Sequence, residues 1–195
     1  MPTGVALRDV REQLFGAAER VLVRDGPSAL TSRAVTTEAG VAKGVLHRHF
    51  TDFDAFLAEL VLDRAARVEG QAAALREAAG TGTVAGHAAA ALTALFSSVA
   101  LEIVALLTFR DGLRGRLRAA GAARIPVLTE ATAMIAAYLA AERDLGRVAP
   151  GADVDTLALT LIGAGHLLFA GRDGTPPEAA EVDKMVATVL AGAVP

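Results

Sequence analysis

The sequence predicts an all-α protein, and three observations support this. Fifty-three per cent of the 195 residues are hydrophobic, which is more than a disordered chain carries. Aromatic residues make up only 4%, and runs of β-branched and aromatic residues, which are typical of strands, are scarce. Apolar residues recur instead at spacings of three and four, between short segments rich in glycine and proline. We expect about nine helices.

The composition of the whole chain excludes several classes of site. The absence of cysteine removes disulfides, thiolate chemistry and cysteine-ligated zinc, and fits a reducing cytoplasm, where we expect the protein to act. The N-terminus has no uninterrupted apolar run of the kind found in secretion signals. Residues 88–107 have the length of a membrane span, but Glu102 and two serines within them favour a buried helix of a soluble protein. A net charge of −3 gives no support for a nucleic-acid partner, so that case rests on local residues.

The first 80 residues contain the clearest helix signals. Residues 9–25 have amphipathic spacing, and Gly26-Pro27 ends that helix. Thr31 or Ser32 is placed to cap a two-turn helix that stops at Gly40. A second short helix is expected over 42–50. Asp52 is placed to cap a long helix that reaches the late seventies, where Gly80, Gly82 and Gly86 supply the break.

The rest of the chain is more apolar and has fewer clear signals for the ends of helices. We expect one very apolar helix over 84–109, an irregular basic stretch, and helices over 125–145, 153–169 and 178–190. The predicted domains are 1–51 and 52–195. Residues 1–67 hold nine basic and nine acidic side chains. The whole net negative charge is therefore carried by residues 68–195.

The stretch GVAKGVLHRHF, residues 40–50, has two different faces when it is placed on a helix. Leu46 and Phe50 lie one turn apart on one side and form a stripe suited to burial. Gly44 and Arg48 lie on the far side, flanked by Val45 and His47, and Lys43 lies in the first turn. A face made of glycine, a small apolar residue and basic residues is suited to close approach to another molecule.

The two short helices and the glycine-containing turn between them have the order of a helix-turn-helix motif. In such motifs the second helix enters the major groove of DNA. Arg48 can then donate two hydrogen bonds to guanine, and Lys43 can neutralise a phosphate.

Residues 9–60 also resemble the N-terminal domain of TetR-type transcriptional regulators. The resemblance is carried by Leu14-Phe15, Gly26 and the run TSRAVTTEAGVAKGVLHRHFTDFDAFL, in order and without gaps. It implies a homodimer in which each subunit inserts one helix into a half-site of a palindromic operator. It also implies a C-terminal helical domain that binds a small molecule and dimerises, with the helix from Asp52 to Ala79 as the lever between the two. The DNA contacts that it implies are Thr31, Ser32, Arg33, Lys43, Gly44, Val45, His47, Arg48 and His49.

Three positions depart from the family pattern, and each loses or alters a phosphate contact. Ala42 stands where a small hydroxyl residue is common, His47 where tyrosine is usual, and Phe53 where lysine is usual. Val45 replaces a residue that is often threonine, and it can pack on a thymine methyl. An imidazole facing phosphate binds better when charged, so His47 predicts tighter binding at low pH.

Each candidate contact also has a purely structural explanation. His49 lies near Leu46 on the helix and can be half-packed against the core, and Arg33 can pair within its own short helix. A metal site at His47 and His49 is disfavoured, because residues two apart on a helix do not face each other. We expect no metal, no cofactor and no catalytic residue.

The C-terminal half predicts an apolar pocket and a dimer surface. The candidate pocket residues are Phe96, Glu102, Met134, Tyr138 and His166. For His87, Glu102, Tyr138 and His166 a structural role is the alternative. The last two helices, over 153–169 and 178–190, alternate apolar with small residues and are the candidate homodimer surface. By the resemblance they would form a four-helix bundle across the dimer axis.

The strongest charge run lies between these features and comprises Arg110, Arg114, Arg116, Arg118 and Arg124. It is either a solvated helix and loop or a site for an acidic ligand or protein partner.

The function that we expect is therefore a ligand-responsive DNA-binding regulator. We expect a repressor that a largely apolar small molecule releases from its operator. An enzyme using Glu102 or His166 as acid or base is the rival, but no phosphate loop, nucleophile elbow or paired-carboxylate motif supports it. A third alternative is a helical binding module that has lost its operator.

Overall fold

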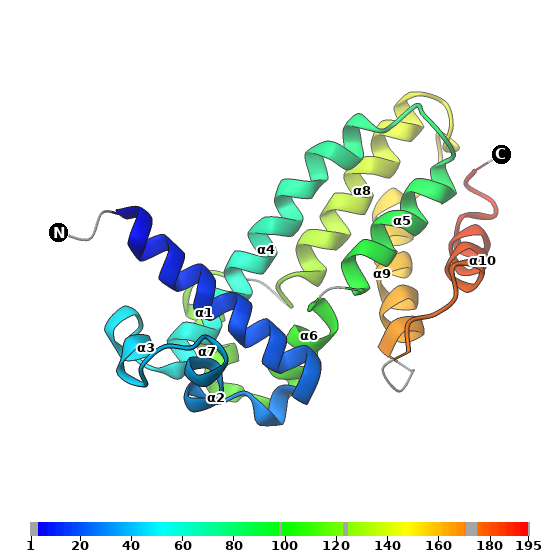
Figure 1. Ribbon diagram of the computed structural model, residues 1–195. Helices are drawn as coiled ribbons and strands as arrows, with labels where there is room; N and C mark the ends of the chain where they lie inside the picture. Colours follow the sequence, from blue (N-terminus) through cyan, green and yellow to red (C-terminus); the bar gives the residue numbers. More distant parts are fainter. Residues whose placement is uncertain (1–3, 98, 123–124, 171–174, 195) are drawn as a thin grey trace. The chain divides into compact units, whose positions relative to one another are not determined.

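The computed structural model describes residues 4–97, 99–122, 125–170 and 175–194, with the side chains of residues 4–9 left aside. These residues form ten α-helices and one short 3-10 helix, and no strand lies among them, which confirms the all-α prediction. Figure 1 shows their order along the chain. The α-helices are α1 (Gly4–Asp25), α2 (Ser32–Glu38), α3 (Gly44–His49), α4 (Phe53–Glu77), α5 (Val84–Phe96), α6 (Ala100–Phe109), α7 (Asp111–Ala119), α8 (Leu128–Asp144), α9 (Val154–Ala170) and α10 (Ala179–Leu190).

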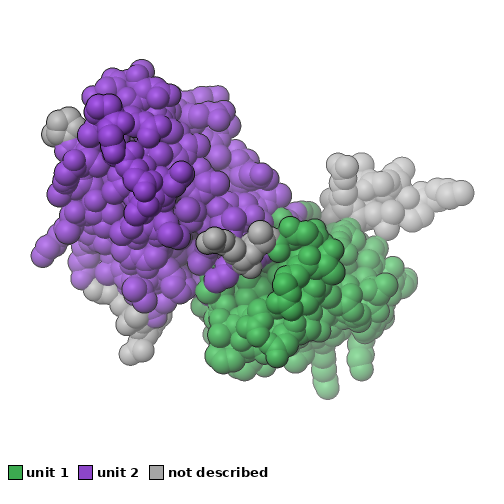
Figure 2. Space-filling model, turned by 180° about the vertical axis from the view of Figure 1, so that it is seen from behind, with its two compact units in different colours: residues 1–62, 102–123 green, residues 63–101, 124–195 purple. Residues whose placement is uncertain are grey.

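The helices form two compact units, coloured separately in Figure 2. The reading unit, as we call the first, comprises residues 1–62 and 102–123, and the second comprises residues 63–101 and 124–195. The segment with α7 and most of α6 thus belongs with the first 62 residues, although some forty residues separate them in sequence. The functional boundary expected after residue 51 stays a prediction.

The expected caps hold the short helices of the reading unit. Thr31 caps α2 by accepting a hydrogen bond from the Ala34 amide at 3.1 Å. Gly40 has a φ of 66°, the left-handed conformation that ends a helix at little cost only for glycine. Asp52 caps α4, because its Oδ1 accepts from the Ala55 amide at 2.8 Å. Local signals of this kind explain why α2, α3 and α4 were predicted within about two residues of their observed bounds, whereas α1 begins five residues before the expected start at residue 9.

The expected single helix over 84–109 is wrong. The chain forms two helices there instead, α5 and α6. The Ser97 amide, at the end of α5, donates to the carbonyl of Thr93 at 2.9 Å. Serine competes with the backbone for hydrogen bonds and favours helix ends, but the apolar residues on both sides concealed this signal.

The expected irregular basic stretch is also wrong where the structure describes it. Residues 111–119 form α7, whose Leu113 and Leu117 are buried one turn apart. Gly112 and Gly115 suggested a loop, yet two buried leucines at this spacing outweigh the roughly 1 kcal/mol that each glycine costs in a helix. Gly86 likewise lies inside α5 rather than in the preceding break, and its amide donates to Thr83, the cap of α5.

The second unit is a bundle in which α5, α8, α9 and α10 lie side by side (Figure 1). Its helices bury the expected apolar stripes, including Leu92, Ile135, Leu161 and Val186. Gly165 allows α9 to approach α5 closely, since a Cβ there would lie 2.7 Å from the Phe96 ring. In the described part of the chain, no single helix is both long and apolar enough to cross a membrane, although the bent α5–α6 pair has the length and composition to do so.

Candidate DNA interface

Helix α3 presents one face to the core and the other to solvent. Leu46 is fully buried, and Phe50, which ends the helix, is 3% exposed. On the side predicted to contact DNA, the exposed residues are Lys43, Gly44, His47 and Arg48. Val45 and His49 are half-buried. Six of the nine predicted contact residues therefore lie on or beside one short helix.

Aromatic contacts anchor this helix to the reading unit. The Phe50 ring lies 5.0 Å from that of Phe56 in an edge-on contact and 6.0 Å from that of Phe15, measured between centroids. The Arg11 guanidinium covers its remaining face, 4.6 Å from the centroid, and forms an ion pair with Glu59. The buried side of α3 therefore fixes the helix in the unit while its other side stays exposed.

The three predicted contacts on α2 differ in their accessibility. Thr31 and Arg33 are exposed, although the Thr31 hydroxyl already accepts the capping bond. The Ser32 hydroxyl oxygen is enclosed and has no hydrogen-bond partner among the described residues. Thr31 and Arg33 are thus presented to solvent, whereas the Ser32 hydroxyl is not.

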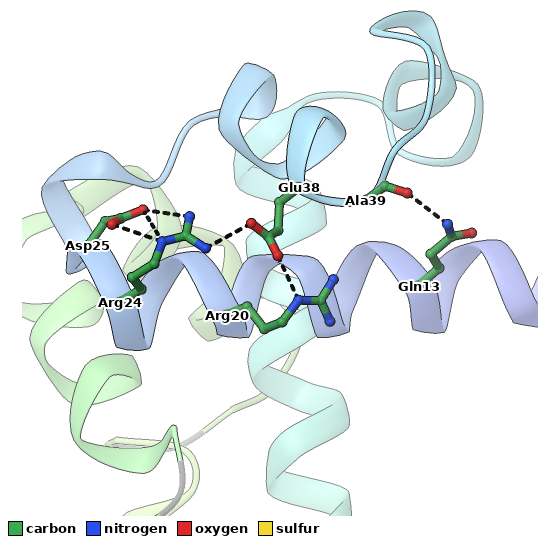
Figure 3. A network of polar contacts seen from close by, with 6 residues as sticks. All are labelled: Gln13, Arg20, Arg24, Asp25, Glu38 and Ala39. Atoms are coloured by element: carbon green, nitrogen blue, oxygen red, sulfur yellow. Dashed lines mark hydrogen bonds and ion pairs between the residues drawn. The ribbon is translucent and has the colours of Figure 1, made fainter.

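A polar network fixes α2 against α1 (Figure 3). Glu38 accepts from Arg20 at 2.7 Å and from Arg24 at 2.9 Å, and Arg24 also binds Asp25. At the same C-terminal end of α2, the Gln13 side-chain amide donates to the Ala39 carbonyl at 2.8 Å. Because α2 has only seven residues, these contacts with α1 hold its orientation better than its own hydrogen bonds do.

The Glu38 network predicts a pH dependence of stability. The Arg20 hydrogen bond, followed by that of Arg24, holds the pKa of the Glu38 carboxyl below its ordinary value of 4.5. A depressed folded pKa means that the contribution to stability is fully present above pH 4.5. It is lost as the pH falls through the lower folded value. We expect Glu38→Gln to reduce the free energy of unfolding at pH 7 and to flatten the fall in stability below pH 4.5. Urea titrations followed by circular dichroism at pH 3.5, 5 and 7 measure this, and an unchanged acid slope would contradict it.

Phe53 fills the position where the resemblance implies a phosphate-contacting lysine. Its ring stacks on Phe56 at 5.7 Å, and the guanidinium of Arg110 lies 5.3 Å from its centroid. The cation at this point of the reading unit thus comes from the junction of α6 and α7. The contacts of Arg110 and Arg11 within the unit could not be predicted from the sequence, because no local pattern relates residues so distant in the chain.

Several arginines of the basic run have partners within the reading unit. Arg114 pairs with Asp111 and donates to the carbonyls of Leu107 and Thr108 at 3.3 Å, and Arg116 pairs with Asp52. Arg118 is exposed and has no ion-pair partner among the described residues. Arg124 lies outside the described residues.

The predicted pocket residues do not all fall in one unit. Phe96, Met134 and Tyr138 are buried in the second unit, and the His166 ring lies 6.2 Å from that of Phe96. Glu102 belongs to the reading unit, where burial raises the pKa of its carboxyl. The Nδ1 atom of His166 is enclosed without a hydrogen-bond partner among the described residues.

The Tyr138 hydroxyl belongs to a buried polar network. It donates to Glu142 at 2.7 Å and lies 3.2 Å from Nδ1 of His87. The fully buried Glu142 also accepts from the Gly80 amide at 3.2 Å and pairs with Arg147 at 3.4 Å. Burial, and then the bond to Glu142, raises the pKa of Tyr138 far above its ordinary value. These contacts give the polar groups of Tyr138 and His87 structural partners, which the sequence analysis had left as the alternative to ligand binding.

With this geometry established, comparison with known proteins identifies the N-terminal domain. Residues 14–60 match the model of the tetR family of bacterial regulatory proteins. Residues 14–60 therefore form an N-terminal domain of the TetR family. The chain is thus a helix-turn-helix regulator of all-α fold. A search of curated proteins found no significant match to this chain.

Solved structures share the fold over nearly the whole chain. A transcriptional regulator from Rhodococcus sp. Rha1 is 21% identical with a TM-score of 0.68, over 95% of this chain and 99% of its own. FadR from Bacillus subtilis, solved with stearoyl-CoA, is 17% identical with a TM-score of 0.68, over 93% and 98%. A TetR-family regulator from Mesorhizobium loti MAFF303099 is 17% identical with a TM-score of 0.66, over 96% and 98%. These similar structures are regulators rather than enzymes.

Proposed function

We propose that the chain is a ligand-responsive repressor of the TetR type that binds a palindromic operator as a homodimer. The observation that carries the proposal is the exposed face of α3. Lys43, Gly44 and Arg48 face solvent, while Leu46 and Phe50 on the opposite side are buried. A short, firmly anchored helix with basic residues and a glycine on its free side suits the major groove.

The roles of the side chains on this face follow from their chemistry. Arg48 reads guanine through two hydrogen bonds, and Val45 contacts a thymine methyl. Lys43, at the start of α3, neutralises phosphate, together with Thr31 and Arg33 on α2. A Cβ on Gly44 would meet no protein atom within 4 Å, so packing within the protein does not require glycine there. In the proposed complex, the missing side chain lets the backbone of α3 approach the groove closely.

The homodimer is proposed to form through α9 and α10. On α9 the side chains of Leu159 and Leu167 are 58% and 75% exposed, and Gly163, midway between them, is exposed as well. Two large apolar side chains on one stripe of a helix are costly to leave in water, and a second copy of the chain would cover them.

The effector is proposed to be a largely apolar small molecule that binds the second unit near Phe96, Met134 and His166. The centroid of the Phe96 ring lies 6.2 Å from that of His166 and 5.5 Å from that of Phe169. The B. subtilis relative FadR was solved with stearoyl-CoA, a molecule with a long apolar chain. An effector that prefers the DNA-free form weakens operator binding by the same factor by which DNA weakens effector binding.

A titration against the DNA upstream of the protein's own gene tests this function. Fluorescence anisotropy at several salt concentrations is expected to give a steeply falling affinity, and nuclease footprinting a palindromic protected region. A scrambled duplex of equal length is the control. Equal affinity for the two duplexes at every salt concentration would contradict the proposal and favour a binding module without an operator.

His47 predicts a pH dependence of operator binding. Its imidazole is exposed, and in the charged form it attracts phosphate. We expect tighter binding at pH 6 than at pH 8 at fixed salt, and the loss of this difference in His47→Gln. His49→Gln, the matched control on the half-buried side, is expected to keep it. A dissociation constant that does not change with pH in the unsubstituted protein would refute this role.

A further inference from the structure

Arg110 connects three parts of the reading unit that are distant in sequence. It lies between the end of α6 and the start of α7. Its Nη2 donates to the Leu30 carbonyl oxygen at 3.1 Å, and its Nη1 pairs with Oδ1 of Asp54 at 3.2 Å. The same guanidinium covers the Phe53 ring at 5.3 Å. One side chain thus contacts segments 80 and 56 residues earlier in the chain.

The two contacted segments are the entry points of α2 and α4. Leu30 directly precedes Thr31, the cap of α2, and Asp54 lies in the first turn of α4. Between them lies the complete helix-turn-helix, with α2 and α3. A side chain bound to both segments therefore fixes the separation between the start and the end of the motif.

Two further contacts dock α7 at the same place. A Cβ on Gly112 would lie 2.8 Å from Oδ2 of Asp54, so the first turn of α7 approaches that carboxylate as closely as only a glycine allows. A carboxylate beside a helix N-terminus is favoured electrostatically. Arg116, one turn further along, pairs with Asp52, which also caps α4.

The same contacts neutralise acidic residues beside the proposed DNA-reading helix. Asp52 and Asp54 follow the last residue of α3, His49, by three and five positions. Residues 1–62 hold seven Lys/Arg and eight Asp/Glu, a formal net charge of −1, and residues 102–123 hold four and two, a formal net charge of +2. Unpaired carboxylates at the start of α4 would repel phosphate, and Arg110 and Arg116 compensate them.

We propose that Arg110 is a positioning residue of the reading unit, which holds the entries of α2 and α4 in register for DNA binding. Arg110 is 30% exposed and Asp54 38%, so their ion pair contributes little to stability by itself. Its effect lies in geometry, because the planar guanidinium binds two acceptors and an aromatic ring at once. This inference rests on the proposed DNA-binding function.

Operator affinity separates positioning from a general effect of charge. Arg110→Ala is expected to weaken operator binding about tenfold, within the range seen for residues that act on a binding site through others. Affinity for scrambled DNA should change by no more than about twofold, since one cation more or less affects all sequences similarly. Arg118→Ala removes the same charge from α7 without breaking a described ion pair, and is expected to act equally weakly on both duplexes. Arg110→Lys keeps the charge but not the planar guanidinium that binds two acceptors, so operator affinity should stay below that of the unsubstituted protein.

A double-mutant cycle tests the proposed partner. In an Asp54→Asn background, which keeps the shape of the side chain, Arg110→Ala is expected to cost clearly less operator affinity than in the unsubstituted protein. Equal losses in the two backgrounds would overturn the role of the Asp54 contact. An operator loss in Arg110→Ala that Arg118→Ala matches, or that Arg110→Lys restores fully, would overturn positioning altogether.

Hydrogen exchange on the free protein tests positioning without DNA. Arg110→Ala is expected to speed amide exchange at residues 31–36 and 54–58, and Arg118→Ala is expected to leave both segments unchanged. If the unsubstituted protein binds no operator while Arg110→Ala still increases exchange there, the proposed function fails and the positioning role stands. If operator binding occurs while Arg110→Ala changes neither exchange nor affinity, the function stands and the inference fails.

Discussion

Phe50→Ala is expected to destabilise the protein by about 3–5 kcal/mol, the usual cost of removing a buried phenylalanine. The ring is 3% exposed and contacts Phe15, Phe56 and the guanidinium of Arg11. Its loss leaves a cavity at the centre of the reading unit and frees the C-terminal end of α3. Operator binding should therefore fail together with folding of this unit.

Urea unfolding followed by far-ultraviolet circular dichroism measures the global effect of Phe50→Ala. The chain contains no tryptophan and a single tyrosine, Tyr138, which is fully buried in the second unit. Tyrosine fluorescence therefore reports on that unit, and hydrogen exchange reports on the first. Thr51→Ala, a neighbouring exposed position, is the control and should stay within about 0.5 kcal/mol of the unsubstituted protein. A loss below about 1 kcal/mol in Phe50→Ala would contradict the packing described for α3.

Arg48→Ala is expected to weaken operator binding by about 1–3 kcal/mol, or roughly five- to 150-fold in Kd. The side chain is exposed in the last turn of α3, opposite the buried Leu46 and Phe50. Removing an arginine that donates two hydrogen bonds to guanine should also relax the preference at one base position. Stability should be nearly unchanged, because an exposed side chain buries little surface.

The control for Arg48→Ala is Arg76→Ala, an exposed arginine in the last turn of α4. It changes the net charge equally, so a general electrostatic effect would lower both affinities alike. Binding to a set of operators with single base changes measures the specificity. If Arg48→Ala keeps full affinity for the operator, the DNA-reading face has been assigned to the wrong residues.

The sequence predicted best those parts of the fold that local chemistry determines. Thr31, Gly40 and Asp52 carry their signals in side-chain type alone, because a cap or a left-handed glycine needs no distant partner. The two faces of α3 followed from helical periodicity, and Leu46 and Phe50 are buried as that periodicity requires. These signals survive in any tertiary context.

The parts that were missed depend on contacts between distant residues or on competing signals. The break between α5 and α6 lies within a continuous apolar run, where hydrophobicity favours a helix on both sides. Helix α7 contains two glycines, and its burial at Leu113 and Leu117 outweighs their low helix propensity. The role of Arg110 at Leu30 and Asp54 becomes visible only when segments far apart in sequence are brought together.

The candidate site shows the same division between local and distant information. The exposure of Lys43, Gly44, His47 and Arg48 could be predicted from one helix. The enclosure of the Ser32 hydroxyl could not, since the atoms that enclose it depend on how α2 packs. Likewise, no pattern in the sequence indicated that the Tyr138 hydroxyl is bound by Glu142.

The substitution Gly44→Ala tests the proposed DNA-reading face most directly, because it separates binding from folding. Gly44 is exposed at the first turn of α3, and a Cβ there meets no protein atom within 4 Å. Alanine should therefore leave the free energy of unfolding unchanged or raise it by about 0.5–1 kcal/mol. Gly70→Ala on α4, which is equally open, is the control. We predict that operator affinity falls about tenfold, or 1.4 kcal/mol, in Gly44→Ala alone. Unchanged operator affinity in a stably folded Gly44→Ala protein would contradict close approach of α3 to DNA.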